Sequence, residues 1–411
     1  MTLRWLNPWR DLRGLPRDSW TLAIVTVINR VGTMVLPFLM LHLTKNLGIE
    51  PARAGLTLGG YGVAALITAP VAGRLSDRIG SARMLKSSLF ATAILMWILP
   101  LARGWGAVSA LIFLLGIAAE AFRPASMALV GDLAGQERRR QGFALNRLAI
   151  NLGMSVGPAL GGVLAMSSFR SLFWVNGATS MLAGAVLFGW PIQAGGPHPR
   201  GHAAPGVRLG EEPGSHARLM YFLVALLPVV LVFFQHEGTM PLFMVQELGF
   251  NEAVYGSMFT INTVLIVLLE VRLNGATAHW PHRRSLAVAA ALCGAGFGAF
   301  ALARSLGEIV AGVVIWTVAE MILFPSASAY VTEIAPPGRR GEYLGYYSMF
   351  FGIGFAIGPA TGTAVMQRFG STTLWGLCFV LGLVAAVLMA RLPIIAAAAP
   401  GGSVQPEPSA E

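Results

Sequence analysis

Six ionisable side chains lie inside long apolar stretches of this sequence. They are Arg30, Glu120, Arg123, His236, Glu237 and Glu320. A charged group at the centre of a lipid bilayer costs roughly 2.5–3.5 kcal/mol on insertion scales, so it is expected to face a partner or a water-filled cavity. A buried carboxyl group without a partner can also exchange protons near neutral pH. The six residues predict charge pairing and reversible protonation, with Glu237 and Glu320 as candidate proton carriers.

The spacing of these residues indicates a shared site. Glu120 and Arg123 are three positions apart, which places them on one face of a helix. Burying an ion pair costs desolvation energy that a pair of apolar side chains avoids. A purely structural role for Glu120 and Arg123 remains open, but a role in lining a cavity is favoured. A Gly-Thr-Met follows Arg30, and a second Gly-Thr-Met follows His236 and Glu237. Two distant parts of the chain therefore place ionisable groups at an equivalent depth.

Composition predicts the elements that must hold these groups. The chain has 411 residues, of which 55% are hydrophobic and 12% charged. Such a sequence cannot bury its apolar surface inside a water-soluble domain. We expect an all-α polytopic membrane protein, because lipid offers no hydrogen bonds to an open backbone. The twelve expected spans are 18–44, 53–74, 85–102, 106–132, 142–167, 170–192, 218–246, 251–273, 285–303, 307–334, 342–367 and 371–395.

An internal duplication divides the chain into two halves. The stretch from Ala119 to Gly162 returns between Ala319 and Thr363, with Glu320 in the place of Glu120. We expect two pseudo-symmetric six-helix bundles, at 18–192 and 218–396. The other parts are an interfacial cytoplasmic segment at 1–17, a linker rich in Gly and Pro at 193–217 and a cytoplasmic tail at 397–411.

Charge along the chain predicts orientation. The net charge of +10 does not form one basic patch, so nucleic acid is not an expected partner. With both termini in the cytoplasm, the inner segments hold nineteen Lys and Arg and the outer loops hold six. This is the positive-inside pattern, and we expect a multi-pass protein of the bacterial inner membrane. The two cysteines, Cys293 and Cys378, lie inside different spans, so neither a disulfide nor a metal site is expected.

Two motifs resemble the major facilitator superfamily. The first is the loop after the second span, with Gly73, Asp77, Arg78, Gly80 and Arg83. Its glycines permit a tight turn, Asp77 can accept hydrogen bonds from a helix N-terminus, and Arg78 can pair with Asp132 at the end of the fourth span. The loop departs from the family pattern at Ser81 and Ala82, where basic residues are usual. A resemblance at these positions implies a cytoplasmic gating motif.

The second motif is a glycine run in the fifth span. It consists of Gly153, Gly157, Pro158, Gly161 and Gly162. Glycines four residues apart let another helix approach closely, and proline permits a bend. The run resembles the helix 5 motif of the superfamily's antiporters, and Arg123 resembles the helix 4 arginine of its proton-coupled exporters. This resemblance implies that Arg30, Glu120 and Arg123 surround a central cavity.

These observations predict a transporter that resembles the twelve-helix drug/proton antiporters. It would export an amphiphilic small molecule in exchange for protons, as a monomer in the lipid bilayer, with a proton gradient and no cofactor. A proton-coupled importer of a small polar solute is the first alternative, because fold does not dictate direction. A lipid- or acyl-modifying membrane enzyme is a second, although no nucleophile and base are clustered. A sensor without flux is a third.

Overall fold

The computed structural model describes residues 14–190, 192, 215–336 and 339–393, and within these ranges it contains helices and no strands. The terminal segments and most of the linker expected from the sequence lie outside these residues. The α-helices are α1 (Arg17–Gly32), α2 (Val35–Leu41), α3 (Pro51–Ile79), α4 (Ser81–Ile98), α5 (Trp105–Glu120), α6 (Phe122–Ser167), α7 (Phe169–Gly189), α8 (Ser215–Phe233), α9 (Gln235–Gly238), α10 (Glu252–Thr277), α11 (His282–Gly298), α12 (Leu306–Ile334), α13 (Arg340–Phe369) and α14 (Ser371–Ala390).

Twelve candidate membrane spans are found among the described residues, as the apolar runs predict. They are Arg17–Asn46, Pro51–Ile79, Ser81–Leu101, Trp105–Ala134, Gln141–Ser167, Phe169–Gly189, Ser215–Gly238, Glu252–Thr277, His282–Ala301, Leu306–Ile334, Arg340–Phe369 and Ser371–Ala390. The largest difference from the expected ranges is in the seventh span, which ends at Gly238 instead of 246. The second span continues to Ile79 instead of ending at 74. Part of the signature loop is therefore helical.

Prolines explain why some spans consist of more than one helix. A proline has no N–H to donate to the carbonyl four residues before it. Pro37 leaves the carbonyl of Thr33 without this donor, and α1 and α2 are separated at that point. Pro124 does the same to Glu120, where α5 ends before α6 begins after Ala121. The chain is thus irregular at Arg30, Glu120 and Arg123, where the sequence carries its buried charges.

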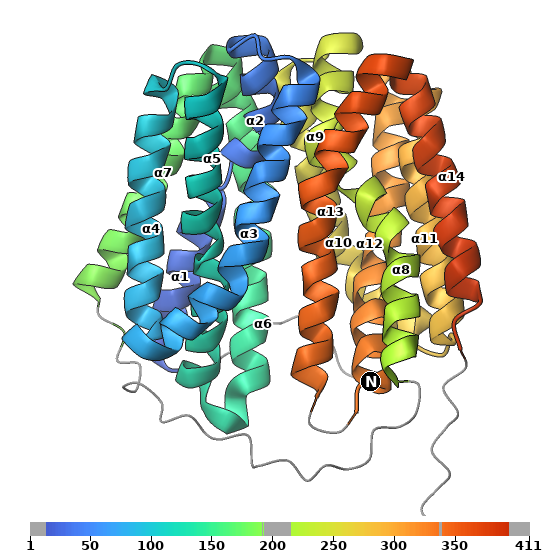
Figure 1. Cartoon of the computed structure of the whole chain (residues 1–411). Helices are drawn as coiled ribbons and strands as arrows, with labels where there is room; N and C mark the ends of the chain where they lie inside the picture. The colour runs from blue at the N-terminus through green and yellow to red at the C-terminus, as the bar shows by residue number, and fades with distance from the viewer. Residues whose placement is uncertain (1–13, 191, 193–214, 337–338, 394–411) are drawn as a thin grey trace, which may run out of the picture.

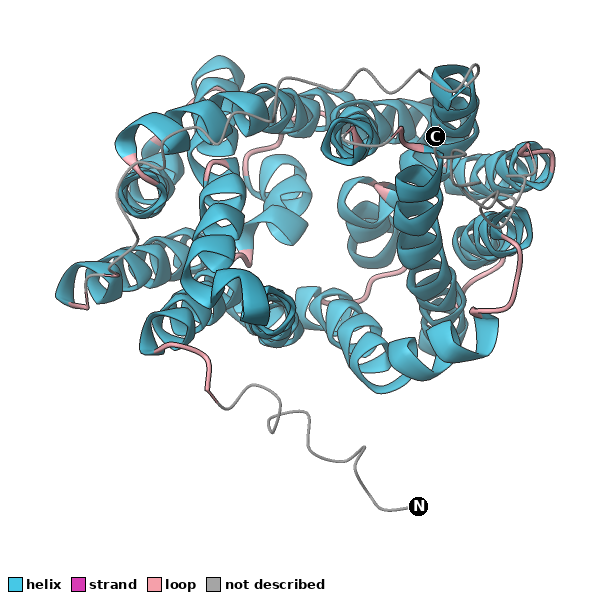
Figure 2. Cartoon of the chain, turned by 90° about the horizontal axis from the view of Figure 1, so that it is seen from below, coloured by secondary structure: helices cyan, strands magenta, loops and turns pink. Residues whose placement is uncertain are grey.

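The helices form two bundles. Figure 1 shows α1 to α7 on the left and α8 to α14 on the right, with α1 and α8 both beginning at the lower end. Seen from below, the two bundles lie side by side and approach each other at two places (Figure 2). α6 contributes to two neighbouring spans: the chain reverses within it, so that Gly142 lies against Ala134.

Two long helix pairs join the bundles: α3 packs on α13, and α6 packs on α10; the short helices α2 and α9 also contact each other. In the first pair, a Cβ at Gly59 would lie 2.4 Å from the carbonyl oxygen of Ala356, and one at Gly62 would meet the same residue at 2.6 Å. Only residues without a side chain fit such an approach. The contacts lie in the upper half of α3, and Figure 1 shows α3 and α13 further apart toward the lower end.

Polar contacts also join the bundles at the upper end. Lys45 forms an ion pair of 2.6 Å with Glu252, which is nearly buried. Gln246 donates to Thr44 at 2.7 Å, and Gln367 donates to Glu50 at 2.6 Å. We call these three contacts the upper latch. Each one connects an N-terminal to a C-terminal bundle residue, so the upper ends are held together.

Candidate functional site

A cavity of about 190 Å³ lies where the N-terminal bundle faces α9. The N-terminal bundle supplies all of its lining residues except one, and the exception is Glu237 of α9. Its apolar wall includes Val35, Leu36 and Leu39 of α2. Its polar lining consists of Asn29, Arg30, Thr33, Tyr61, Ser88, Thr92, Glu120, Arg123, Asn176 and Glu237. Four of the six ionisable residues selected from the sequence therefore share one cavity.

Arg30 is placed by the glycine run of α6. A Cβ at Gly153 would lie 2.3 Å from the Cβ of Arg30, and one at Gly157 would lie 2.9 Å from its carbonyl oxygen. The close approach of α6 brings Arg30 to the cavity beside Phe122, whose ring centre is 5.9 Å from the guanidinium carbon. Arg30 forms no hydrogen bond or ion pair with another described residue, and its Nε is buried.

Glu120 and Arg123 both line the cavity, but they do not form the expected ion pair. Glu120 accepts a hydrogen bond of 3.0 Å from the hydroxyl of Tyr61 on α3. Arg123 is exposed and has no hydrogen bond or ion pair among the described residues. The helix is interrupted at Ala121, so the regular three-residue spacing that predicts a pair does not apply. Sequence reasoning missed Tyr61, whose signal is a phenol within an apolar glycine-rich segment.

His236 and Glu237 are neighbours in α9, and of the two only Glu237 lines the cavity. The side chain of Glu237 is 13% exposed, and its Oε1 is 3.6 Å from Nε2 of His236. The Nδ1 of His236 is 2.6 Å from the carbonyl oxygen of Phe233. A carbonyl can only accept, so Nδ1 must carry hydrogen, and a proton can come and go only at Nε2, the nitrogen that faces Glu237. His236 itself is buried and does not line the cavity.

Glu320 is not part of the cavity lining. It lies within the C-terminal bundle, where the amide of Asn262 donates to its Oε2 at 2.9 Å and to Thr317 at 3.0 Å. His236 stacks on Trp316, one turn before Glu320, with ring centres 5.9 Å apart. The expectation that Glu320 and His236 open onto the same cavity as Arg30 therefore does not hold in this structure. Both lie in the C-terminal bundle, outside the cavity lining.

The signature loop has only part of the expected geometry. Gly80 has a φ of +94° and ends α3, so it supplies the tight turn that glycine allows. Gly73 lies inside α3 and makes no turn, and α4 begins without a side-chain cap from Asp77. Asp77 and Arg78 are exposed, and the pairing of Arg78 with Asp132 is not formed. Arg83 lies in the first turn of α4.

Two further contacts of charged residues lie outside the cavity. Glu333 lies 2.7 Å from Nε2 of His282. Arg147 forms an ion pair with Glu270 of the other bundle. Contacts between residues so far apart in sequence leave no local signal.

The remaining members of the glycine run contact two different partners. Gly161 faces Met34 and Phe38 in the first span. On the other side, a Cβ at Gly162 would lie 2.6 Å from the carbonyl oxygen of Glu252, and the carbonyl of Pro158 lies against Gly256. The run thus serves packing within its own bundle and packing across to α10.

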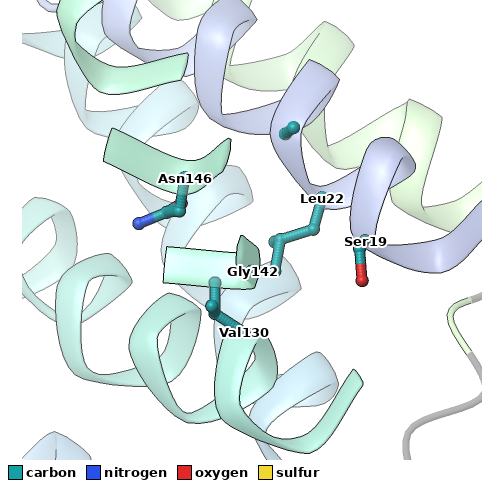
Figure 3. A pocket seen from close by; sticks show the side chains of 6 residues that line it. Ser19, Leu22, Val130, Gly142 and Asn146 are labelled. Carbon is teal, nitrogen blue, oxygen red and sulfur yellow. The ribbon is translucent and has the colours of Figure 1, made fainter. Parts of the chain in front are cut away.

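A second, much smaller pocket lies near the lower end, between α1 and α6. Figure 3 shows its lining, in which Ser19 and Leu22 come from α1 and Val130, Gly142 and Asn146 come from α6. It contains no ionisable side chain, so we do not assign it to the site. Within the described part of the chain, no group of three or more His, Cys, Asp or Glu residues could hold a metal ion.

The fold and the cavity define a class: a twelve-span helical membrane protein with an ionisable cavity at the junction of two bundles. The sequence matches the Major Facilitator Superfamily over residues 22–306 and 230–408, and the chain belongs to this family. It is a membrane transporter and not an enzyme.

Similar proteins are spread over the superfamily. An uncharacterized MFS-type transporter of Bacillus subtilis, YqjV, is 29% identical over 381 residues, which covers 89% of this chain and 90% of that protein. A Na(+), Li(+), K(+)/H(+) antiporter of Planococcus maritimus is 22% identical, covering 79% and 84%. The crystal structure of a peptide transporter, POT, in complex with sulfate has a TM-score of 0.79 at 16% identity, covering 91% and 94%. At this identity the last similarity shows the fold alone.

Proposed function

We propose that this chain is a proton-coupled exporter of an amphiphilic small molecule, which it moves across the bacterial inner membrane by alternating access. One observation carries the proposal: ionisable groups from both bundles meet at one cavity. Arg30, Glu120 and Arg123 come from the N-terminal bundle, and Glu237 comes from the C-terminal bundle. A rocking motion of the bundles changes the surroundings of all four groups together.

The arrangement of contacts between the bundles supports alternating access. The upper latch and the glycine contacts of α3 hold the upper ends together. With the termini in the cytoplasm, the upper end faces outside, and this state offers its cavity to the cytoplasm. The opposite state requires the latch to open and the lower ends to close.

The coupling chemistry fits His236 and Glu237. The imidazole presents Nε2 to the carboxylate at 3.6 Å, so one proton can be held by either group. Glu237 borders the cavity, whereas His236 is buried and stacks on Trp316, one turn before Glu320. Protonation here removes a negative charge from the cavity and biases the two states through its effect on the bound molecule.

The direction of transport rests on resemblance. The glycine run matches an antiporter motif at every defining position, and the relative from Planococcus maritimus is named as an antiporter. Export is therefore proposed over import, and the experiment below decides between them.

Everted membrane vesicles test direction and coupling together. Vesicles energised by ATP accumulate protons, and an amphiphile added outside, such as a zwitterionic quinolone, is expected to enter them in exchange for protons. The proton loss is read as recovery of acridine orange fluorescence. Glu237→Gln is expected to abolish the signal, and the matched control Glu342→Gln, at an exposed site outside the cavity, is expected to preserve it. If protons leave the vesicles only when solute leaves together with them, the protein moves both in the same direction, which would contradict export.

A further inference from the structure

Two guanidinium groups of the cavity form no hydrogen bond or ion pair with a described residue. Arg30 has a cation–π contact to Phe122 and lies in the field of Glu120, and Arg123 has neither kind of bond. The acid that lies between them in sequence, Glu120, accepts its hydrogen bond from Tyr61 instead. For Arg30, whose Nε is buried, a charge withdrawn from water without such a bond is costly, whereas Arg123 is exposed. The pair is therefore available for a ligand.

Guanidinium groups select a particular chemistry. Their planar N–H donors match the oxygens of carboxylates, phosphonates and sulfonates, often with two parallel hydrogen bonds. Arg30 and Arg123 line the same cavity from α1 and α6. An anionic group that reaches both of them satisfies donors that the protein leaves open.

The C-terminal bundle offers the opposite charge. Glu237 is its only residue in the cavity lining, and the Oε2 of this carboxylate is buried without a hydrogen-bond partner among the described residues. Its Oε1 is 3.6 Å from His236, beyond hydrogen-bond length. A carboxylate in this setting accepts from an ammonium group or another strong donor.

Apolar side chains complete the lining. Val35, Leu36 and Leu39 of α2 face the cavity together with Met96 and Leu115. These residues can contact a hydrocarbon segment that connects two charged ends. The two signs of charge come from different bundles, so one molecule that bridges them contacts both halves of the transporter.

We propose that the cargo is a small zwitterion. Its anionic group binds Arg30 and Arg123, its ammonium group binds Glu237, and its hydrocarbon segment lies on the apolar wall. This inference rests on the proposed function and names the substrate class for the same site. A proton and the ammonium group compete for the Glu237 carboxylate, so protonation from outside releases the cationic end of the cargo. The competition supplies the exchange that an antiporter requires.

Binding to the purified full-length chain tests the proposal without a gradient. The probes are ω-amino acids of increasing length, from β-alanine to aminooctanoate, and the carboxylate and the amine with the same carbon skeleton. Isothermal titration calorimetry is expected to give one preferred length. At that length the amino acid should bind at least about tenfold more tightly than either single-charge analogue, since each charged hydrogen bond is lost with its group.

Variants separate the two ends of the molecule. Glu237→Gln is expected to lower the affinity for the amino acid to that for the carboxylate, and to leave carboxylate binding within about twofold. Arg123→Gln is expected to weaken binding of the amino acid and of the carboxylate, because only Arg30 then remains for the anionic group, and to leave binding of the amine within about twofold. Glu237→Asp keeps the charge on a shorter side chain, so it should favour the next longer amino acid. Melting and size-exclusion profiles verify that each variant is folded.

Three results would overturn the proposal: no member of the series binds, a single-charge analogue binds as tightly as the amino acid, or folded Glu237→Gln keeps the full preference. Failure of the proposed function has a different signature. Zwitterion binding without proton exchange in everted vesicles refutes the antiporter and leaves the cargo class standing. Proton-coupled export of a compound that carries only one charge refutes the cargo class and leaves the antiporter standing.

Discussion

Replacing Gly59 by alanine should shift the transporter away from the state described above. In this state a Cβ at position 59 would lie 2.4 Å from the carbonyl oxygen of Ala356, and a backbone atom cannot yield as a flexible side chain does. Overpacking of this kind costs roughly 1–3 kcal/mol. The cost applies only while the upper ends are joined, because the other state separates α3 from α13. A difference of about 1.4 kcal/mol is tenfold, so the population ratio should change by roughly five- to 150-fold.

Gly60 provides a matched control. No atom lies within 4 Å of a Cβ built at this neighbouring position. Gly60→Ala therefore brings the same gain in helix propensity, about 1 kcal/mol, without the collision. That gain is common to both states because α3 stays helical, so it does not bias their ratio.

Distances between spin labels give the readout. Labels at Leu47 and Phe369 report on the upper end, and labels at Arg74 and Gly345 report on the lower end; all four positions are exposed. Electron–electron double resonance should show a longer upper distance and a shorter lower distance in Gly59→Ala, and the parent distribution in Gly60→Ala. Identical distributions in the two variants would refute the view that this contact holds the upper ends closed.

Three further predictions concern single polar contacts. Lys45→Met removes the ion pair to Glu252, which leaves a nearly buried carboxylate unpaired, so the upper ends should open in the same distance measurement. Tyr61→Phe removes the hydrogen-bond donor of Glu120 and should lower stability by about 1–3 kcal/mol, read as a lower melting temperature in detergent. His236→Gln should abolish proton-coupled solute exchange in everted vesicles, because an amide cannot carry the proton at the position of Nε2.

Each of these has a result that would contradict it. An unchanged upper distance in Lys45→Met would show that the ion pair does not contribute to the latch. A Tyr61→Phe protein as stable as the parent would mean that Glu120 has another donor. Full exchange activity in His236→Gln would remove the imidazole from the coupling route.

Much of the fold follows from the sequence because the bilayer imposes a single strong requirement. Apolar segments must be long enough to span it and must satisfy their backbone internally, so the positions of the spans follow from composition. The same logic singles out Arg30 and Glu237, because charge within such a segment needs a wet or paired site. The turn at Gly80 follows from the conformational freedom of glycine.

Other features depend on contacts that no local pattern carries. The interruption at Ala121 undoes the pairing that the spacing of Glu120 and Arg123 suggests, although Pro124 signals it. The hydrogen bond from Tyr61 to Glu120 and the position of Glu320 outside the cavity lining depend on how α3, α9 and α12 pack. Depth in the membrane can be predicted from sequence, but the direction of a side chain around a helix bundle cannot be predicted without the bundle.

The most direct test of the account is the charge movement that a pH jump produces in proteoliposomes on a solid-supported membrane, without any cargo. If Glu237 is the proton-binding group of the cavity, a step toward acid pH should move positive charge into the parent protein. Glu237→Gln should lose this transient, and Glu342→Gln should keep it. A transient of parental size in folded Glu237→Gln would contradict the central claim that this carboxylate carries the coupling proton.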